Sequence, residues 1–304
     1  MTNLNGIRTI VAATDFSEDA ACAAAWAKEI ARQHGARLVL VHAFVAEAVP
    51  APEFVPLPPQ YYEEIHGEAR RHLDEEAAGL RSGGIAVETD LVLSSPVLGI
   101  ADAARRHHAD LIVAGTRGRT GWKRALLGST AARLLREAPC PVPTVHRQDN
   151  GHPRPVRTVL VPTDFSEDAA LAADAASRFL GAAGTDHRLV LLHAYRVPVE
   201  AMHLPANVLM EAIRTTADAA RTTLQELAAK LRRPGLTVEP TTRQGYPPDV
   251  IVEHAATAGA DLIAMGTHGR SGLGRVLLGS TAERVVATAP CPVLTVRRTN
   301  GGAA

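Results

Sequence analysis

Two glycine-rich stretches carry the residue types that a phosphate-binding loop needs. Each follows a short apolar run that predicts a buried strand, and each precedes a run that predicts a helix. Glycine lets the backbone approach a phosphate closely, and the first amides of a helix point outward unpaired. The sequence therefore predicts two anion sites, which share the spacing Gly-x2-Gly-x9-Gly-Ser-Thr at Gly115, Gly118, Gly128, Ser129 and Thr130, and again at Gly266, Gly269, Gly279, Ser280 and Thr281.

An acidic residue follows the first predicted strand of each copy. The stretches Thr14–Ser17 and Thr163–Ser166 both read Thr-Asp-Phe-Ser. The carboxylates of Asp15 and Asp164 could accept hydrogen bonds from the hydroxyl groups of a ligand. They could also do no more than begin the next helix, although the serine two residues later is already a good N-cap. Both interpretations stay open at this point.

The chain is a tandem duplication. Asp164 lies 149 residues after Asp15, and Gly266 lies 151 residues after Gly115. A repeat of that length is a duplicated domain rather than a solenoid unit, whose period is typically about 20–50 residues. The 304 residues also suit about two domains on length alone. We expect a first domain over 1–147, a linker over 148–156 and a second domain over 157–304.

Within each copy, apolar runs alternate with helical periodicity. The order reads β-α-β-α-β-α-β-α-β, which right-handed crossovers convert into a doubly wound parallel sheet of five strands, an α/β, Rossmann-like fold. Ligands of such sheets lie beyond the carboxyl ends of the strands, where the winding reverses. If the first and fourth strands are neighbours there, Asp15 faces the loop that begins at Gly115.

Glycines and serines predict where the helices end and begin. Gly35 and Gly184 occupy positions typical of a glycine that ends a helix. Ser129 and Ser280 stand at the expected N-cap positions of the helices after the glycine loops, so their hydroxyls could cap the helix, bind phosphate or do both.

Composition limits the partners and the compartment. The chain has 32 Lys and Arg against 32 Asp and Glu, so no net charge favours nucleic acid or an anionic membrane. No apolar stretch approaches the length of a membrane helix, and the N-terminus does not resemble a signal peptide. The three cysteines match no zinc or redox spacing, and Cys140 and Cys291 are expected to be small buried side chains. We expect a cytoplasmic protein that binds no nucleic acid and no membrane.

The combination of these motifs, in the same order twice, resembles ATP-binding universal stress proteins. The resemblance implies an adenine nucleotide alpha hydrolase-like fold and an adenine nucleotide (ATP, or ADP or AMP) as ligand, with Mg2+. It implies that Asp15 and Asp164 bind the ribose end, that Ala43 and Ala194 lie against the adenine, and that the loops surround the phosphates, with added charge from Arg119, Lys123, Arg270 and Arg275. The implied nucleotide-binding residues are Thr14, Asp15, Ala43, Gly115, Arg117, Gly118, Gly128, Ser129, Thr130, Thr163, Asp164, Ala194, Gly266, His268, Gly269, Gly279, Ser280 and Thr281.

Three functions remain open. The first is a nucleotide-dependent regulatory protein of a stress response, for which a homodimer through an open sheet edge is plausible. The second is an enzyme, such as a slow ATPase or a nucleotidyl or phosphoryl transferase. The third is a holdase-like structural protein with empty sites. The sequence has no Walker A motif, no Gly-x-Ser-x-Gly elbow and no His-Glu-x-x-His pair, which disfavours the enzyme.

Overall fold

The chain folds into two compact units. The computed structural model describes residues 6–45, 59–82, 84–118, 127–147, 153–181, 186–197, 201, 203–269 and 278–298. One unit spans Ile7–Pro153, and the other is built mainly from Arg154–Ala304. They are called the N-terminal unit and the C-terminal unit below, and each is described by itself.

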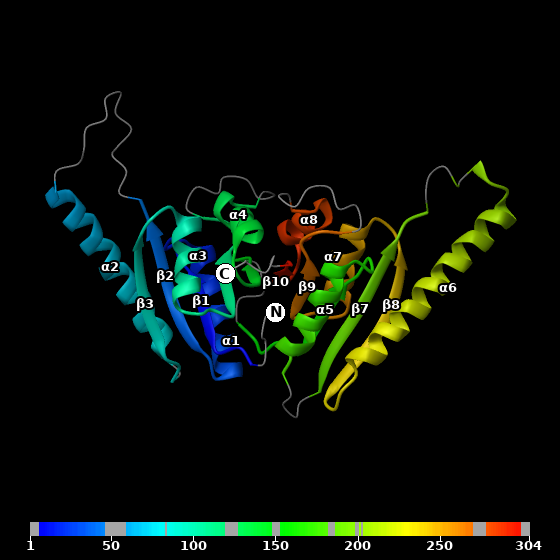
Figure 1. Cartoon of the computed structure of the whole chain (residues 1–304), viewed down its shortest axis with the longest axis horizontal. Helices are drawn as coiled ribbons and strands as arrows, with labels where there is room; N and C mark the ends of the chain where they lie inside the picture. The colour runs from blue at the N-terminus through cyan, green and yellow to red at the C-terminus, as the bar shows by residue number, and fades with distance from the viewer. Residues whose placement is uncertain are drawn as a thin grey trace, which may run out of the picture. The chain divides into compact units, whose positions relative to one another are not determined.

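The N-terminal unit is a five-stranded parallel sheet in the order β3-β2-β1-β4-β5. Its elements alternate along the chain (Figure 1) as β1 (Thr9–Ala13), α1 (Glu18–His34), β2 (Arg37–Phe44), α2 (Pro59–Arg81), β3 (Val87–Leu93), α3 (Pro96–Arg106), β4 (Leu111–Gly115), α4 (Ser129–Glu137) and β5 (Val142–Val145).

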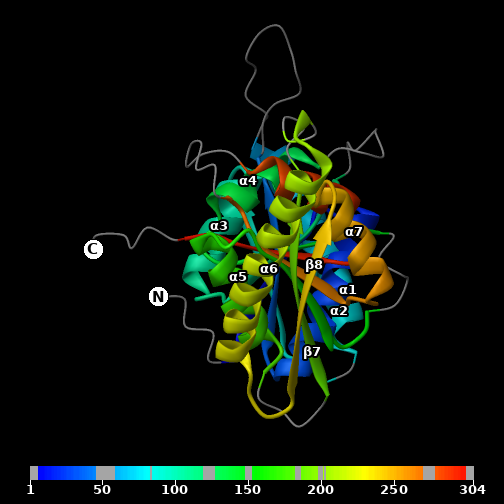
Figure 2. The same cartoon turned by 90° about the vertical axis from the view of Figure 1, so that its right-hand side faces the viewer.

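The C-terminal unit repeats this arrangement in the order β8-β7-β6-β9-β10, again with parallel pairs. Figure 2 shows α6 running beside β7 and β8. The elements are β6 (Thr158–Pro162), α5 (Glu167–Phe179), β7 (His187–Tyr195), α6 (Ala206–Leu231), β8 (Leu236–Gln244), α7 (Pro247–Thr257), β9 (Leu262–Gly266), α8 (Ser280–Thr288) and β10 (Val293–Val296). The predicted doubly wound fold is therefore confirmed in both copies.

Helices cover both faces of each sheet. In the N-terminal unit, α1 packs on β1 and β4 and contacts α2, while α3 packs on β2 and contacts α4. The strands between these layers are buried on both faces, which explains their continuous apolar runs. The winding reverses between β1 and β4, so the carboxyl ends of these two strands define the crevice at which a ligand is expected.

Two predictions about helix ends are wrong. The helix expected to end at Gly184 ends at Phe179, and Gly181 takes the left-handed conformation with φ of 70°. Gly184 itself lies outside the described residues. The N-caps of α4 and α8 are Gly128 and Gly279 rather than the serines that follow them. Gly35 ends α1 with φ of 65°, as predicted.

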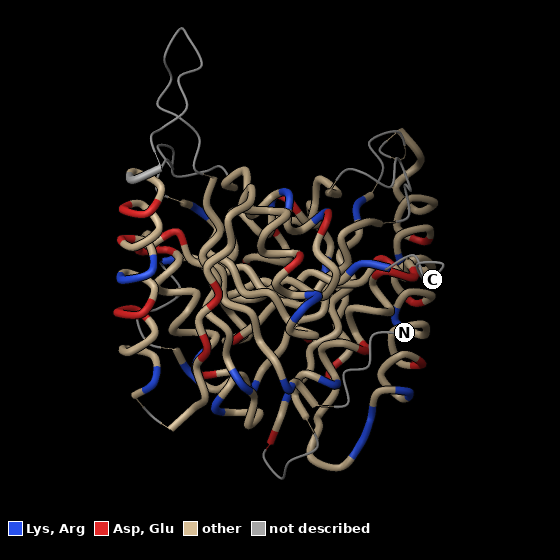
Figure 3. Tube along the Cα trace, turned by 60° about the vertical axis from the view of Figure 1, so that its left-hand side comes forward, with Lys and Arg blue, Asp and Glu red and all other residues tan. Residues whose placement is uncertain are grey.

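Acidic and basic residues are interspersed along the described trace (Figure 3). Among the helices that the structure describes, none combines the length and the apolar character that a membrane crossing requires.

Candidate nucleotide site

The turn after β1 is held in one conformation by its own side chains. Thr14 Oγ1 accepts the Phe16 amide at 3.0 Å, and Asp15 Oδ1 accepts the Ser17 amide at 3.1 Å. These bonds hold Phe16 at φ of 63°, a left-handed conformation that is uncommon for a residue other than glycine. Ser17 Oγ accepts the Ala20 amide and so caps α1. Because Ser17 supplies the cap, Oδ2 of Asp15 is not needed to cap α1.

The turn after β6 repeats this geometry. Thr163 Oγ1 accepts the Phe165 amide at 3.0 Å, and Asp164 Oδ1 accepts the Ser166 amide at 3.0 Å. Phe165 has φ of 64°. The same strained turn at the same place in both units indicates a constraint shared by the two copies.

In both units the second carboxylate oxygen lies against a loop glycine. A Cβ added to Gly118 would lie 2.5 Å from Asp15 Oδ2, and one added to Gly269 would lie 2.7 Å from Asp164 Oδ2. No real Cβ approaches an oxygen so closely, so only glycine leaves the aspartate in this position. The structure thus brings together the acid and the glycine loop that the sequence placed about a hundred residues apart.

The described ends of each loop are tied together at their base. The Gly128 amide donates to Thr116 O at 2.8 Å, and the Gly279 amide donates to Thr267 O at 2.9 Å. The arginines and the lysine expected to add charge, at 119, 123, 270 and 275, lie outside the described residues. A main-chain hydrogen bond thus joins the two ends of each loop beside the aspartate.

The helix that follows each loop begins one residue earlier than its hydroxyls predict. Ser129 and Ser280 are the first residues of α4 and α8, and neither helix has a side-chain cap. The Ala132 amide closes the first helical turn on Gly128 O, which leaves the amides of residues 129–131 without helical acceptors. The hydroxyl groups of Ser129 and Thr130, and of Ser280 and Thr281, therefore lie at a helix start that they do not cap.

Ala43 offers its main chain rather than its side chain. Ala43 is 8% exposed, and a Cβ on Gly99 of α3 would lie 2.8 Å from Ala43 Cβ, so its methyl packs against α3. The Thr14 amide donates to Val41 O at 2.9 Å, where β1 ends. Because main-chain groups alternate between neighbouring strands, the N–H and C=O of Ala43 point to the same side as those of Val41, beyond the end of β1.

Ala194 is placed in the same way. The Thr163 amide donates to Leu192 O at 2.8 Å, two residues before Ala194. Each unit therefore has a donor and an acceptor on β2 or β7 directed toward the crevice, an arrangement that suits the edge of a planar base.

Arg117 and His268 occupy equivalent positions in the two loops. His268 contacts the threonine before it and Asp168 of α5. His268 Nδ1 lies 3.0 Å from Thr267 Oγ1 and 3.4 Å from Asp168 Oδ2. In the N-terminal unit the corresponding threonine, Thr116, instead meets His146 Nδ1, at 2.7 Å. The histidine that contacts the buried threonine thus comes from the end of β5 in one unit and from the loop in the other.

Comparisons with known proteins show the family of the chain. The model of the universal stress protein family matches residues 6–146 and 155–297. The chain belongs to the universal stress protein family. It is 32% identical over 307 residues to Universal stress protein Rv2623 of Mycobacterium tuberculosis, covering 98% of this chain and 99% of the relative. It is 30% identical over 297 residues to Universal stress protein Rv2005c of the same species, covering 95% and 97%.

Solved structures show the same fold along the whole chain. A universal stress protein from Archaeoglobus fulgidus superposes with a TM-score of 0.70 at 23% identity, covering 99% of this chain and all of that one. A second, from Pseudomonas aeruginosa, has a TM-score of 0.63 at 22% identity, with 97% and 94% covered. Tandem universal stress protein domains are therefore shown for this chain by its sequence relatives and its fold.

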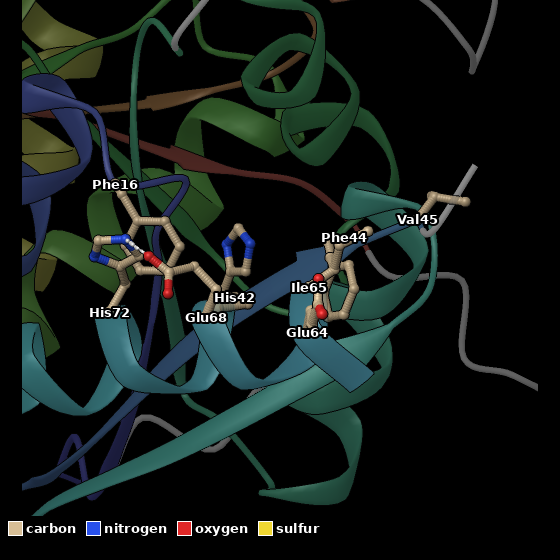
Figure 4. A pocket seen from close by; sticks show the side chains of 9 residues that line it. Phe16, His42, Phe44, Val45, Glu64, Ile65, Glu68 and His72 are labelled. Atoms are coloured by element: carbon tan, nitrogen blue, oxygen red, sulfur yellow. Dashed lines mark ion pairs between the residues drawn. The ribbon is translucent and has the colours of Figure 1, made fainter. Parts of the chain in front are cut away.

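This universal stress protein has a pocket beside the turn of its N-terminal unit that the sequence did not predict. The pocket has a volume of about 660 Å³ and lies between the β1 turn, the end of β2 and α2 (Figure 4). The His42 ring lies 4.4 Å from that of Phe16 and 5.9 Å from that of Phe44, and on α2 His72 pairs with Glu68 at 3.1 Å. Since His42 and Ala43 are consecutive in β2, the pocket and the methyl of Ala43 lie on opposite faces of the sheet.

His42 holds the turn after β1 through a hydrogen bond to the main chain of Thr14. Its Nδ1 lies 2.7 Å from Thr14 O, and because a carbonyl only accepts, this nitrogen carries a proton. His193 makes the same bond to Thr163 O at 2.8 Å. Each histidine lies near the end of an apolar run, and that pattern does not predict the contact.

Glu76 of α2 is a second residue that the sequence did not reveal. Thr14 Oγ1 donates to Glu76 Oε2 at 2.9 Å. Burial raises the pKa of the Glu76 carboxyl above its ordinary value; the Thr14 hydrogen bond lowers it, and the charge of Asp15 raises it further. A carboxyl that holds its proton more tightly than usual therefore contacts the residue next to Asp15.

Within the described parts of both units, no three His, Cys, Asp or Glu side chains are grouped so that they could hold a metal ion. Mg2+ bound with a nucleotide keeps several waters and takes most of its remaining ligands from the phosphates. The site could therefore accept Mg2+ together with a nucleotide without a protein cage of its own.

Proposed function

We propose that each unit of this universal stress protein binds an adenine nucleotide, ATP or the related ADP or AMP, together with Mg2+. The protein then acts as a nucleotide-dependent regulatory protein in a stress response. The observation that carries the proposal is the close approach of the loop glycine to the aspartate in both units, where a Cβ added to Gly118 or Gly269 would lie only 2.5 or 2.7 Å from the carboxylate oxygen.

Three features support a nucleotide rather than a simple anion. Each helix start offers amides without helical acceptors and hydroxyls that do not cap the helix, and both suit phosphate oxygens. Asp15 and Asp164 repel a bare anion but can accept hydrogen bonds from ribose hydroxyls. The main chain of Ala43 and Ala194 presents a donor and an acceptor toward the crevice. Phosphate, sugar and base each meet a matching group.

The direct test is identification of the bound molecule. The purified protein is denatured, and the released small molecules are identified by mass spectrometry. We expect an adenine nucleotide in an amount approaching two per chain. In parallel, Mg-ATP and ADP should raise the melting temperature, because a ligand that binds only the folded state stabilises it by mass action. No released nucleotide and no shift at millimolar concentration would reject the proposal and favour the holdase-like alternative.

Slow hydrolysis is the second candidate, supported by the cradle of glycines and the helix amides, since positioning alone accelerates phosphoryl transfer. A multiple-turnover assay distinguishes the two. A kcat near the value of about 10 per second that is typical of enzymes would make the protein an ATPase rather than a binding protein.

We also propose a homodimer in the cytoplasm that pairs through an open sheet edge. The neutral net charge, with acidic and basic residues interspersed along the trace, supports a protein that binds neither nucleic acid nor membrane. Sedimentation equilibrium of the full chain tests the dimer, and a gel-shift assay at low salt tests nucleic acid.

A further inference from the structure

Glu76 gives the N-terminal site a group that the C-terminal site does not have. Its Oε2 accepts the Thr14 hydroxyl at 2.9 Å, while its Oε1 is buried with no hydrogen-bond partner among the described residues. Thr14 Oγ1 in turn accepts the Phe16 amide, so the carboxyl is linked through one hydroxyl to the strained turn that carries Asp15.

The counterpart of Glu76 in the C-terminal unit is Leu227. The fully buried Leu73 and Ala77 of α2 correspond to Leu224 and Ala228 of α6, each 151 residues later. The flanking strands keep the same offset, since Leu38 pairs with Val87 and Leu189 pairs with Val238. The register between α2 and α6 is therefore fixed from both sides, and the position that is Glu76 in one unit is apolar in the other.

Among the described residues, few charged groups surround this carboxyl. Asp15 faces it from the turn, His42 lies on β2 under Thr14, and His72 is one helical turn earlier on α2. On α1, Lys28 bonds Ser82 near the far end of α2. From the β3 side, Thr89 engages Asp74 and Arg70. The charge of Asp15 is the one that acts on Glu76, so removing a proton from Glu76 places two negative groups at the ribose side of the site.

We propose that Glu76 is a positioning residue of the N-terminal nucleotide site, which holds Thr14 for Asp15 and makes nucleotide affinity in this unit alone depend on its own protonation. The inference rests on the function proposed above. When Glu76 is protonated, Oε2 can still accept the Thr14 hydroxyl, so the turn is kept while the repulsion of the anionic ligand is lost. The N-terminal site therefore binds more tightly as the pH falls, beyond any change that both sites share.

The test separates the two sites within the full chain. Gly269→Ala leaves only the N-terminal site intact, and Gly118→Ala leaves only the C-terminal one, by the close approaches given above. The Kd for Mg-ATP is measured calorimetrically from pH 5.5 to pH 8 in each background. Protonation of ATP itself affects both sites equally and cancels in the ratio of the two Kd values. Because the two loops also differ at Arg117 and His268, comparison with Glu76→Gln in the same background isolates the contribution of Glu76. We expect that ratio to change by about two- to fivefold across the range, as for a partly exposed charge pair.

Three variants complete the test. Glu76→Gln keeps the acceptor and should reduce the pH profile of the N-terminal site to that of the C-terminal site. Leu227→Glu in the other background should introduce the extra pH dependence there. Glu75→Gln is the matched control, since Glu75 lies on the same helix with a 60% exposed side chain paired to Arg71, and it should change nothing.

The outcomes distinguish this inference from the function on which it rests. If neither background binds nucleotide, both fail. If both bind and their pH profiles are parallel, or if Glu76→Gln folds normally and keeps the parent profile, the role of Glu76 is rejected while nucleotide binding stands.

Discussion

Replacing the loop glycines by alanine separates binding from stability. In the double variant Gly118→Ala, Gly269→Ala the added methyls would lie 2.5 and 2.7 Å from the Oδ2 atoms of Asp15 and Asp164. The atom that must move is the end of a flexible side chain, and neither glycine has a positive φ. The backbone therefore tolerates alanine, and the reduced entropy of the unfolded chain offsets part of the strain by about 0.4–1 kcal/mol per site.

The double substitution is instead expected to lower the affinity for the nucleotide. A displaced carboxylate loses its charge-assisted hydrogen bonds to the nucleotide, worth about 1.5–3 kcal/mol. That corresponds to a Kd about 10 to 150 times higher, since each 1.4 kcal/mol is tenfold. At a nucleotide concentration of about 100 times the native Kd, ligand stabilises each unit by about 2.7 kcal/mol, and a hundredfold loss of affinity reduces this to about 0.4 kcal/mol.

Calorimetric titration and thermal melts with and without Mg-ATP measure both quantities. The control is Gly79→Ala in α2, where an added Cβ meets nothing within 4 Å and should slightly raise the melting temperature without changing affinity. Unchanged affinity in the double variant would refute a binding role for the aspartates. A large loss of stability without ligand would refute the claim that the aspartate side chain, rather than the backbone, gives way.

Four further predictions follow from single contacts. Gly266→Ala places a Cβ 2.8 Å from a backbone carbon of Asp168, which cannot move cheaply, so denaturant melts should show the C-terminal unit destabilised by about 1–3 kcal/mol. Asp110→Ala removes the acceptor of two backbone amides at the start of β1, at 2.8 and 3.0 Å, and should destabilise the N-terminal unit by about 1–3 kcal/mol; selective loss of the other unit would contradict this. Burial and the charge of Asp110 raise the pKa of the Cys140 thiol to about 12, so peptide mapping after alkylation at pH 8 should show this cysteine reacting about a thousandfold more slowly than an unperturbed thiol. The folded-state pKa of Glu76 is raised, so its contribution to stability is lost as the pH rises through that value; melts of Glu76→Gln should exceed those of the native chain at pH 8 and converge with them at pH 4.

The sequence predicted the fold and the meeting of acid and glycine loop because both depend on order along the chain. Alternating strands and helices with right-handed crossovers leave few topologies, and a reversal next to β1 brings the ends of β1 and β4 together. This strand order alone therefore predicts that Asp15 lies next to the glycine loop.

The errors at helix ends have a local cause. Glycine occurs at both 181 and 184, and the apolar pattern does not decide which of them ends α5. At α4, serine is the better N-cap by preference, yet Gly128 takes the position because its amide closes the loop on Thr116 O. A long-range bond thus overrides a local preference, and only the structure reveals it.

Glu76 shows the limit of sequence reasoning most clearly. The exchange of glutamate for leucine between the copies is visible in the printed sequence, but on a helix whose outer positions are mostly charged it looks like any surface change. Its meaning comes from the packing of α2 on β2 and β3, which brings one position of that helix to the Thr14 hydroxyl. Helical periodicity predicts the face of a helix that is buried, not the side chain of another element that it meets.

The two histidines that contact the buried threonines show the opposite case, in which the sequence positions differ but the contact is kept. Position 117 is arginine and position 268 is histidine, while position 146 is histidine and position 297 is arginine, so each pair of equivalent positions differs. The contact is nevertheless kept, because His146 reaches Thr116 from the end of β5 and His268 reaches Thr267 from the loop. Comparing the copies position by position counts two substitutions at the base of the loop where the structure preserves one interaction. At position 76, by contrast, the equivalent residue is Leu227, and the described residues around it show no carboxylate bonded to Thr163. On the inference proposed above, this difference makes the two sites unequal.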